Sequence, residues 1–258
     1  MSYLIDSHTH LHDREFFTGE QAEQMLANAR NLNVRQVICI GTSHADSLAA
    51  RDFAATHSDV FWTYGTHPEY AADYLVDCQK SDKLVAIGEV GLDYHYPNYD
   101  KAKQWRLLEE MLNLAIELDL PVSFHVRDAL PDFFAIFDNF PQLRPSVLHS
   151  FSDSKQNLEI ALSKGLYIGV NGLATFANLD CYKEATPELL DRIVLETDAP
   201  FLTPVPKRGI INESGYVKYV ADYLSTKLGV SADLVAEKTT KNVRQIFHLP
   251  NPWGTGEH

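Results

Sequence analysis

Short apolar runs rich in β-branched and aromatic residues alternate with longer amphipathic segments along the whole chain. The short runs predict eight strands, because each is brief and is bounded by polar or turn residues. The predicted strands are residues 3–6, 36–40, 60–65, 84–89, 121–125, 146–149, 166–170 and 193–197. This spacing is typical of the strand, loop, helix and loop of a (β/α)8 TIM barrel, so we expect that α/β fold.

The segments between these strands carry apolar residues at helical spacing. They predict helices at residues 20–32, 45–56, 102–118, 132–137 and 155–164. Residues 171–187 show no such pattern, and no helix is predicted there. After the eighth strand, residues 216–228 predict a helix, and residues 232–238 and 241–247 predict two short ones. We therefore expect extra C-terminal helices that cover the barrel, with Asn242 as a helix cap or a loop contact.

The composition favours a single compact domain over residues 1–258. The chain is 45% hydrophobic, and it has no Ser/Gly/Pro-rich linker and no sequence repeat. No apolar run is long enough to cross a bilayer and no signal-like segment opens the chain, so we expect a cytoplasmic protein without a membrane partner. The three cysteines are widely spaced, which predicts reduced thiols. Nothing indicates an obligate protein partner, and a monomer is the default expectation.

The charge balance limits the possible partners. With 22 basic against 35 acidic residues, the net charge of -13 makes the surface as a whole repel polyanions. This argues against a protein that coats nucleic acid. It still allows an enzyme that holds one end of a strand at a local site, because metal ions and a few cationic side chains can reverse the field there.

Side chains that bind metals stand at the C-terminal ends of the predicted strands, where barrel enzymes place their active sites. The first strand leads into His8 and His10, which share one face because alternate side chains of an extended segment do. Later strands end in Glu89, His125, His149 and Asp198, and His67 follows the third strand. Convergence of these groups on one rim favours a metal site over scattered surface histidines.

The motifs at these strand ends resemble those of the TatD family of metal-dependent hydrolases and deoxyribonucleases, in the amidohydrolase-like superfamily. They are residues 6–11 (DSHTHL), 65–68 (GTHP), 86–94 (AIGEVGLDY), 125–129 (HVRDA), 149–152 (HSFS) and 195–202 (LETDAPFL). The resemblance implies that His8, His10, Glu89 and Asp198 hold one metal ion. Glu89, His125 and His149 would hold a second, with Glu89 bridging the two. It also implies 3′-to-5′ exonuclease activity on DNA, with RNA as a further candidate substrate.

The residue types leave the identity of the two divalent ions open. Imidazole and carboxylate ligands without thiolate suit Zn, Mn or Co and, with more oxygen ligands, Mg. The nitrogen-rich set favours Zn or Mn, whereas nuclease activity in the resembled family is usually associated with Mg. Two ions about 3.5 to 4 Å apart would activate a water and clamp phosphoryl oxygens. Asp198 is our candidate to take the proton of that water, which makes Asp198 and Glu89 the catalytic candidates.

Several side chains are candidates to contact a substrate phosphate. His67 lies at a strand end, although His-Pro also makes a strand-to-loop turn. Arg127 is placed to bind phosphate or to pair with Asp128 or Glu89. Lys207 and Arg208 form a basic pair in the loop after the eighth strand, where phosphate contact and simple solvation are equally open.

The sequence gives weaker evidence that other polar and aromatic residues near the strand ends take part in the site. Asp93 is expected to orient a ligand or fix a loop. Ser150 and Ser152 lack the surroundings of a serine nucleophile, so loop capping is the better interpretation. Candidates to stack a base are Trp62, Tyr94, Tyr96 and Phe176, for which packing in the core or in loops is the commoner role.

Two other functions remain open from the sequence. An amide or ester hydrolase, such as an aminoacyl-tRNA deacylase or a cyclic amidohydrolase, would use nearly the same metal ligands, since a fold does not fix a substrate. A barrel that binds metal or a partner without turnover is the third possibility, which retention of the full ligand set argues against. A phosphodiester substrate predicts basic contacts from Arg127 and from Lys207 or Arg208, together with a steep loss of activity with salt, whereas a small amide substrate predicts neither.

Overall fold

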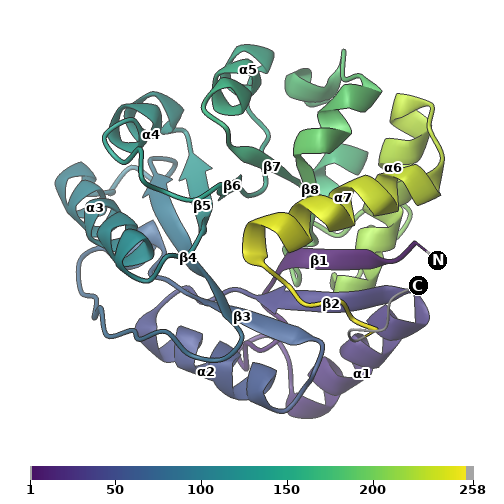
Figure 1. The fold of residues 1–258 in the computed structure, drawn as a ribbon, viewed down its shortest axis with the longest axis horizontal. Helices are drawn as coiled ribbons and strands as arrows, with labels where there is room; N and C mark the ends of the chain where they lie inside the picture. Colours follow the sequence, from purple (N-terminus) through teal and green to yellow (C-terminus); the bar gives the residue numbers. More distant parts are fainter. Residues whose placement is uncertain (1, 254–258) are drawn as a thin grey trace.

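The computed structural model describes residues 2–253 and forms a sheet of eight parallel strands whose spatial order follows the chain. The strands are β1 Leu4–Thr9, β2 Val34–Cys39, β3 Val60–Tyr64, β4 Leu84–Asp93, β5 Val122–Arg127, β6 Val147–Leu148, β7 Tyr167–Val170 and β8 Ile193–Leu195. The end of β1 meets the segment after β8, where Thr9 pairs with Ala199, so the sheet nearly closes on itself (Figure 1). The predicted TIM barrel is confirmed.

Helices form the outer layer of the barrel (Figure 1). They are α1 Gly19–Asn31, α2 His44–Ala55, α3 Lys101–Glu117, α4 Leu130–Phe137, α5 Lys155–Ser163, α6 Val217–Leu228 and α7 Ala232–Phe247. Short 3-10 turns fill the remaining connections: η1 Pro68–Tyr70, η2 Gly172–Thr175, η3 Asp180–Tyr182, η4 Pro187–Arg192 and η5 Ser214–Tyr216. Residues 171–187, all of them described, hold no α-helix, as expected. None of the helices among residues 2–253 has the length and apolar character to span a bilayer.

The C-terminal helix α7 is continuous, so the prediction of two short helices is wrong. Its central threonines find partners without breaking it: the Thr239 hydroxyl donates to the carbonyl of Val235, 2.8 Å away within the helix. Asn242 lies inside this helix and is not a cap. Its buried amide donates to the carbonyls of Leu190 and Ile193 at 2.8 and 2.7 Å, which confirms the alternative of a loop contact.

Alternation along the strands divides the apolar side chains into two clusters. One cluster packs between the strands and the outer helices, with Val37 and Cys39 as examples. The other fills the barrel interior with residues such as Ile38, and the α7 residues Ile246 and Phe247 join it. Figure 1 shows α7 crossing one end of the barrel. Because α7 closes the N-terminal end, the opposite end is left for polar side chains.

Two glycines allow the strands that carry site residues to approach one another. A Cβ on Gly65, after β3, would lie 2.2 Å from the carbonyl carbon of Gly88 in β4. A Cβ on Gly91 would lie 1.8 Å from the carbonyl oxygen of His125 in β5. Neither position has room for a side chain, and this close packing fixes where Glu89 and His125 project.

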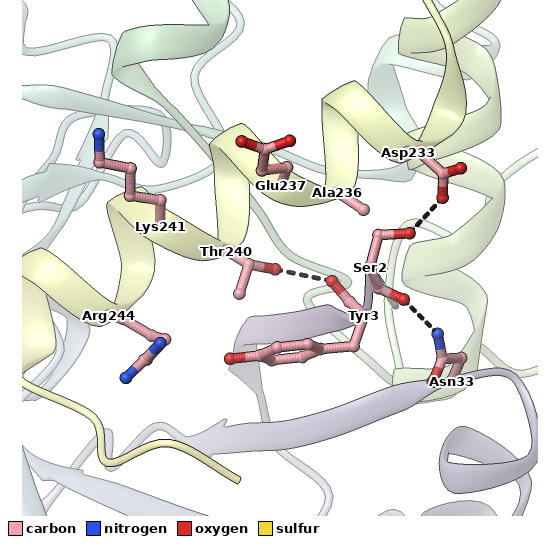
Figure 2. Close-up of a pocket in the computed structure, with 9 residues that line it drawn as sticks. All are labelled: Ser2, Tyr3, Asn33, Asp233, Ala236, Glu237, Thr240, Lys241 and Arg244. Carbon is pink, nitrogen blue, oxygen red and sulfur yellow. Dashed lines mark hydrogen bonds between the residues drawn. The ribbon is translucent and has the colours of Figure 1, made fainter. Parts of the chain in front are cut away.

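A groove of about 870 Å³ lies at the N-terminal end of β1, against α7. Figure 2 shows the Thr240 hydroxyl donating to the carbonyl of Tyr3 at 2.8 Å, and the Asn33 amide donating to the carbonyl of Ser2 at 2.6 Å. These bonds join the start of the chain to α7 and to the turn before β2. The groove is thus at the end of the barrel opposite the histidines.

Candidate metal centre

Six predicted ligands come together at the C-terminal end of the barrel. His8 lies in β1, Glu89 in β4 and His125 in β5, while His10 and His149 directly follow β1 and β6, and Asp198 lies in the loop after β8. Glu89 faces the others with both oxygens. Its Oε2 lies 3.4 Å from His8 Nε2, and its Oε1 lies 2.8 Å from His125 Nδ1 and 2.9 Å from His149 Nε2.

Asp198 completes one side of this centre. Its Oδ1 lies 3.6 Å from His8 Nε2 and 3.5 Å from His10 Nε2. The possible ion-binding groups, in which all donor atoms lie within 4.8 Å of one another, are His8–His10–Asp198, His8–Glu89–His149 and His67–Glu89–His125. Glu89 thus presents one oxygen to each side, the arrangement that a carboxylate shared by two ions requires.

The side chain of His8 provides a direct test of whether a metal fits. This imidazole is completely buried, and neither of its ring nitrogens has a hydrogen-bond partner among the described residues. An unpaired buried polar atom costs free energy, so such a nitrogen needs another partner. Its Nε2 faces carboxylate oxygens at distances too long for good hydrogen bonds but compatible with a shared cation. The donor set therefore fits a divalent ion.

The two carboxylates of the centre stay ionised despite burial. Burial disfavours the charged form of Glu89, but the charges of His149 and His8 and hydrogen bonds with His125 and His149 outweigh it and hold its pKa well below the usual range. At Asp198, burial is likewise outweighed by the bond with His10 and the charges of His149 and His8, so its pKa is lowered. Two anionic donors consequently face the imidazoles, as a bound cation requires.

Three further carboxylates support the ligands. Asp93 lies with its Oδ2 3.0 Å from Nε2 of His125 and accepts the backbone N–H of His95 on Oδ1 at 2.9 Å. It therefore contacts a ligand and fixes a loop, the two roles expected for it. Glu196 Oε1 lies 3.5 Å from His149 Nδ1 and accepts the Ser150 N–H at 2.6 Å.

Asp6 joins β1 to the segment after β8, across the seam where the barrel closes. Its oxygens accept the backbone N–H and the hydroxyl of Thr197 at 2.8 and 2.7 Å. The sequence reasoning assigned no role to Asp6 or Glu196. A signal was present, because Asp6 lies within the apolar strand β1 and Glu196 directly follows the apolar strand β8, where an unpaired carboxylate would be costly.

His67 lies beside the ligands, as one of the three ion-binding groups includes it. Its ring centroid is 4.3 Å from that of His125. Burial and the nearby His125 lower the pKa of His67 to about 4, so its imidazole is neutral at physiological pH. Because Nδ1 accepts the Glu69 N–H at 3.2 Å, the proton of the neutral ring resides on Nε2.

The predicted basic contacts rest on aromatic rings, with Arg127 and Arg208 exposed and Lys207 half-buried. Arg127, the last residue of β5, has its Cζ 5.6 Å from the ring centroid of Tyr96. It forms no ion pair with Asp128 or Glu89 among residues 2–253; Asp128 instead lies 2.9 Å from His95.

Lys207 and Arg208 point to different partners and do not act as a pair. Lys207 Nζ lies 5.5 Å from the ring centroid of Tyr216, and Arg208 Cζ lies 3.9 Å from that of Phe176. Trp62 is 3% exposed and donates its indole N–H to the Asp82 carbonyl, so the suggestion that it stacks a base is wrong.

Comparison with known proteins agrees with this geometry. Residues 5–248 match the family described as TatD related DNase. The chain is 32% identical over 255 residues to the uncharacterized metal-dependent hydrolase YcfH of Escherichia coli K12, covering 96% of each chain. It is 32% identical over 246 residues to the 3′-5′ ssDNA/RNA exonuclease TatD of Erwinia tasmaniensis, covering 90% of this chain and 95% of that one.

A solved structure extends the likeness to three dimensions. The TatD homologue YjjV of Escherichia coli K12 superposes with a TM-score of 0.85 at 27% identity, over 96% of this chain and 98% of that one. The match in sequence spans the strands that carry all the candidate ligands. The chain therefore belongs to the TatD family and is a metal-dependent hydrolase.

Proposed function

We propose that this hydrolase removes nucleotides from the 3′ end of single-stranded DNA, with RNA as a second substrate. The observation that carries the proposal is the placement of Arg127 and Arg208, two exposed guanidinium groups on aromatic rings at the C-terminal end of the barrel. They stand on a chain whose net charge is -13, so cations gathered beside a metal centre indicate a polyanionic substrate. The exonuclease name of the Erwinia relative supports the same substrate and polarity.

The six ligands would hold two divalent ions, with Glu89 between them. Such ions lower the pKa of a water molecule and neutralise charge on the phosphodiester. Asp198 is ionised because its pKa is lowered, so it accepts the proton of the attacking water and returns it to the leaving oxygen. His67 carries its proton on Nε2 and donates a hydrogen bond to a phosphate oxygen.

A competing hydrolase of small neutral amides or esters has no use for the exposed arginines. A small neutral substrate gains nothing from Arg127 or Arg208, and its hydrolysis would change little with salt. A strand bound through phosphates releases counterions, so its binding weakens steeply as salt is added. The dependence of the rate on salt therefore separates a polyanionic strand from a small neutral amide or ester.

The proposal is tested with a 5′-labelled single-stranded oligonucleotide and apo protein reloaded separately with Mg, Mn and Zn. We expect successive shortening from the 3′ end, blocked by an inverted 3′-terminal nucleotide, and a loss of orders of magnitude in the Asp198→Asn variant. Products shortened from the 5′ end, or no cleavage by metal-loaded protein, would overturn the proposal. Near-normal rates in Asp198→Asn would remove Asp198 from the mechanism.

A further inference from the structure

Large exposed hydrophobic side chains gather at the same end of the barrel as the candidate metal centre. Among the described residues, most of them lie in loops that follow the C-terminal ends of strands, including Phe16, Tyr96, Phe176 and Phe201. Scattered exposed apolar residues are normal on a protein surface, but a concentration around one mouth marks a contact surface.

Phe201 is the exposed aromatic side chain that contacts a ligand of the centre. Its ring centroid lies 6.4 Å from that of His10 and 5.2 Å from that of Phe16, which meets it edge to face. Phe201 is 47% exposed and Phe16 is 44% exposed. The loops that carry them are joined at the barrel seam, where His10 N–H donates to the Ala199 carbonyl at 2.8 Å. The two rings, perpendicular to each other, therefore form one open aromatic platform beside the candidate metal ligands, in which Phe16 supports Phe201 edge to face.

A second aromatic surface continues from this platform along the neighbouring loop. The Val205 N–H, four residues after Phe201, donates to the Thr175 hydroxyl at 2.9 Å and ties the loop after β8 to η2. Phe176 directly follows η2, is 40% exposed, and carries the Arg208 guanidinium 3.9 Å from its ring centroid. Arg208 is held there because it also donates to the Thr203 carbonyl at 2.8 Å.

We propose that Phe201, supported edge to face by Phe16, stacks the 3′-terminal base of an unpaired strand and that Phe176 and Arg208 bind the nucleotide before it. The inference rests on the proposed nuclease function and adds how the strand is held. An unpaired strand presents what this surface matches: a π-face for each exposed ring and a phosphate for the arginine. A paired end keeps its bases stacked within the duplex, so the platform selects single strands.

The test measures binding and does not depend on cleavage. A 5′-fluorescein oligonucleotide with cleavage-resistant phosphorothioate linkages, and the same strand with an abasic 3′-terminal nucleotide, are titrated with metal-loaded protein by anisotropy. Stacking on an aromatic side chain is worth about 10-fold in affinity. We expect Phe201→Ala to weaken the ordinary strand about 10-fold and to change binding of the abasic strand little. Phe201→Leu should behave like the alanine variant, because an aliphatic side chain offers no π-face.

Matched variants separate stacking from general damage. Trp253→Ala removes a 57% exposed aromatic ring that packs on Tyr3 at the other end of the barrel, and it should bind both strands as wild type does. Arg208→Gln should reduce the slope of log K against log salt by about 0.7, the value for one phosphate on a single strand. Metal content and melting temperature show whether each variant keeps its centre and its fold.

The outcomes distinguish this inference from the proposed function. Equal weakening of both strands by Phe201→Ala, or no weakening of either, would overturn the stacking platform even in a protein that shortens DNA. Selective weakening in a protein that cleaves no strand would keep the platform and refute the nuclease. Failure of the wild type to bind any strand would refute both.

Discussion

Replacing Asp93 by Asn tests whether a carboxylate outside the ligand set tunes the metal centre through His125. Asp93 accepts two hydrogen bonds on separate oxygens, one from the His125 ring and one from the His95 N–H. An asparagine has one acceptor oxygen, so one of those donors must face the amide N–H₂ group. The site is 7% exposed, which leaves little water to replace the lost acceptor.

The expected loss of metal affinity follows from the way Asp93 orients His125. His125 turns Nδ1 to Glu89 and Nε2 to Asp93, so the acceptor fixes which nitrogen keeps the proton. Loss of such a partner lowers metal affinity about 10- to 100-fold, or about 1.4 to 2.8 kcal/mol. We expect this loss for the ion nearer His125 in the Asp93→Asn protein, with a smaller effect on the ion nearer His10.

The assay is competition between the apo protein and a chromogenic chelator of known affinity. Asp128→Asn is the matched control, because Asp128 also contacts a histidine, His95, but its side chain is 63% exposed and far more hydrated. The control should bind metal as wild type does. Two ions bound with unchanged affinity by Asp93→Asn would refute the positioning role of Asp93.

Three further predictions concern stability. Asn242→Ala leaves the carbonyls of Leu190 and Ile193 without a donor, so the melting temperature should fall by about 3 to 10 °C. The control Asn113→Ala, on the exposed face of α3, should change the melting temperature little. Equal shifts in the two variants would show that the hydrogen bonds of Asn242 do not anchor α7. Burial acts to raise the pKa of Asp59, but its bonds to Arg30 outweigh burial, so its pKa in the folded protein is lowered. The Arg30–Asp59 pair therefore stabilises the folded protein fully at pH values above the unfolded pKa of about 3.9. This stabilisation is lost as the pH falls through the lower pKa of the folded protein. Urea unfolding should show Asp59→Asn less stable by about 1 kcal/mol at pH 7, with the difference shrinking in acid; a constant difference would exclude this linkage. Chelation should leave the far-UV circular dichroism unchanged, because the apolar clusters do not include the candidate ligands. It should lower the melting temperature by about 10 to 20 °C relative to protein whose two sites are each held at a hundredfold excess of metal over Kd. Loss of the circular dichroism signal would show that the fold itself needs metal.

The sequence predicted the barrel and the convergence of the candidate ligands because both depend on patterns local to the chain. Strand alternation gave the order of elements, and ligand residues at strand ends had to meet on one rim once the barrel closed. The break predicted in α7 came from Thr239 and Thr240, which disfavour a helix interior. In the fold these hydroxyls bond to Val235 and Tyr3, and the second bond depends on a strand far away in the sequence.

Of the supporting carboxylates only Asp93 was placed from the sequence, because the partners of Asp6 and Glu196 come from distant strands. The bonds of Asp6 to Thr197 join β1 to the segment after β8, and that seam exists only in the closed barrel. Phe16 and Phe201 likewise meet through the same seam. Solvent exposure decides which of the candidate stacking residues can reach a base, and only the fold shows it: Trp62 is buried, whereas Tyr96 is 62% exposed.

A metal titration tests most directly whether a two-ion centre around Glu89 trims the 3′ end of a strand. Mn is added in steps to apo protein while bound metal and 3′ shortening of a single-stranded oligonucleotide are measured in the same samples. We predict that activity appears as the second equivalent binds, and that Glu89→Ala neither holds two ions nor cleaves. Full activity with one equivalent, or two bound ions without any shortening, would contradict the account.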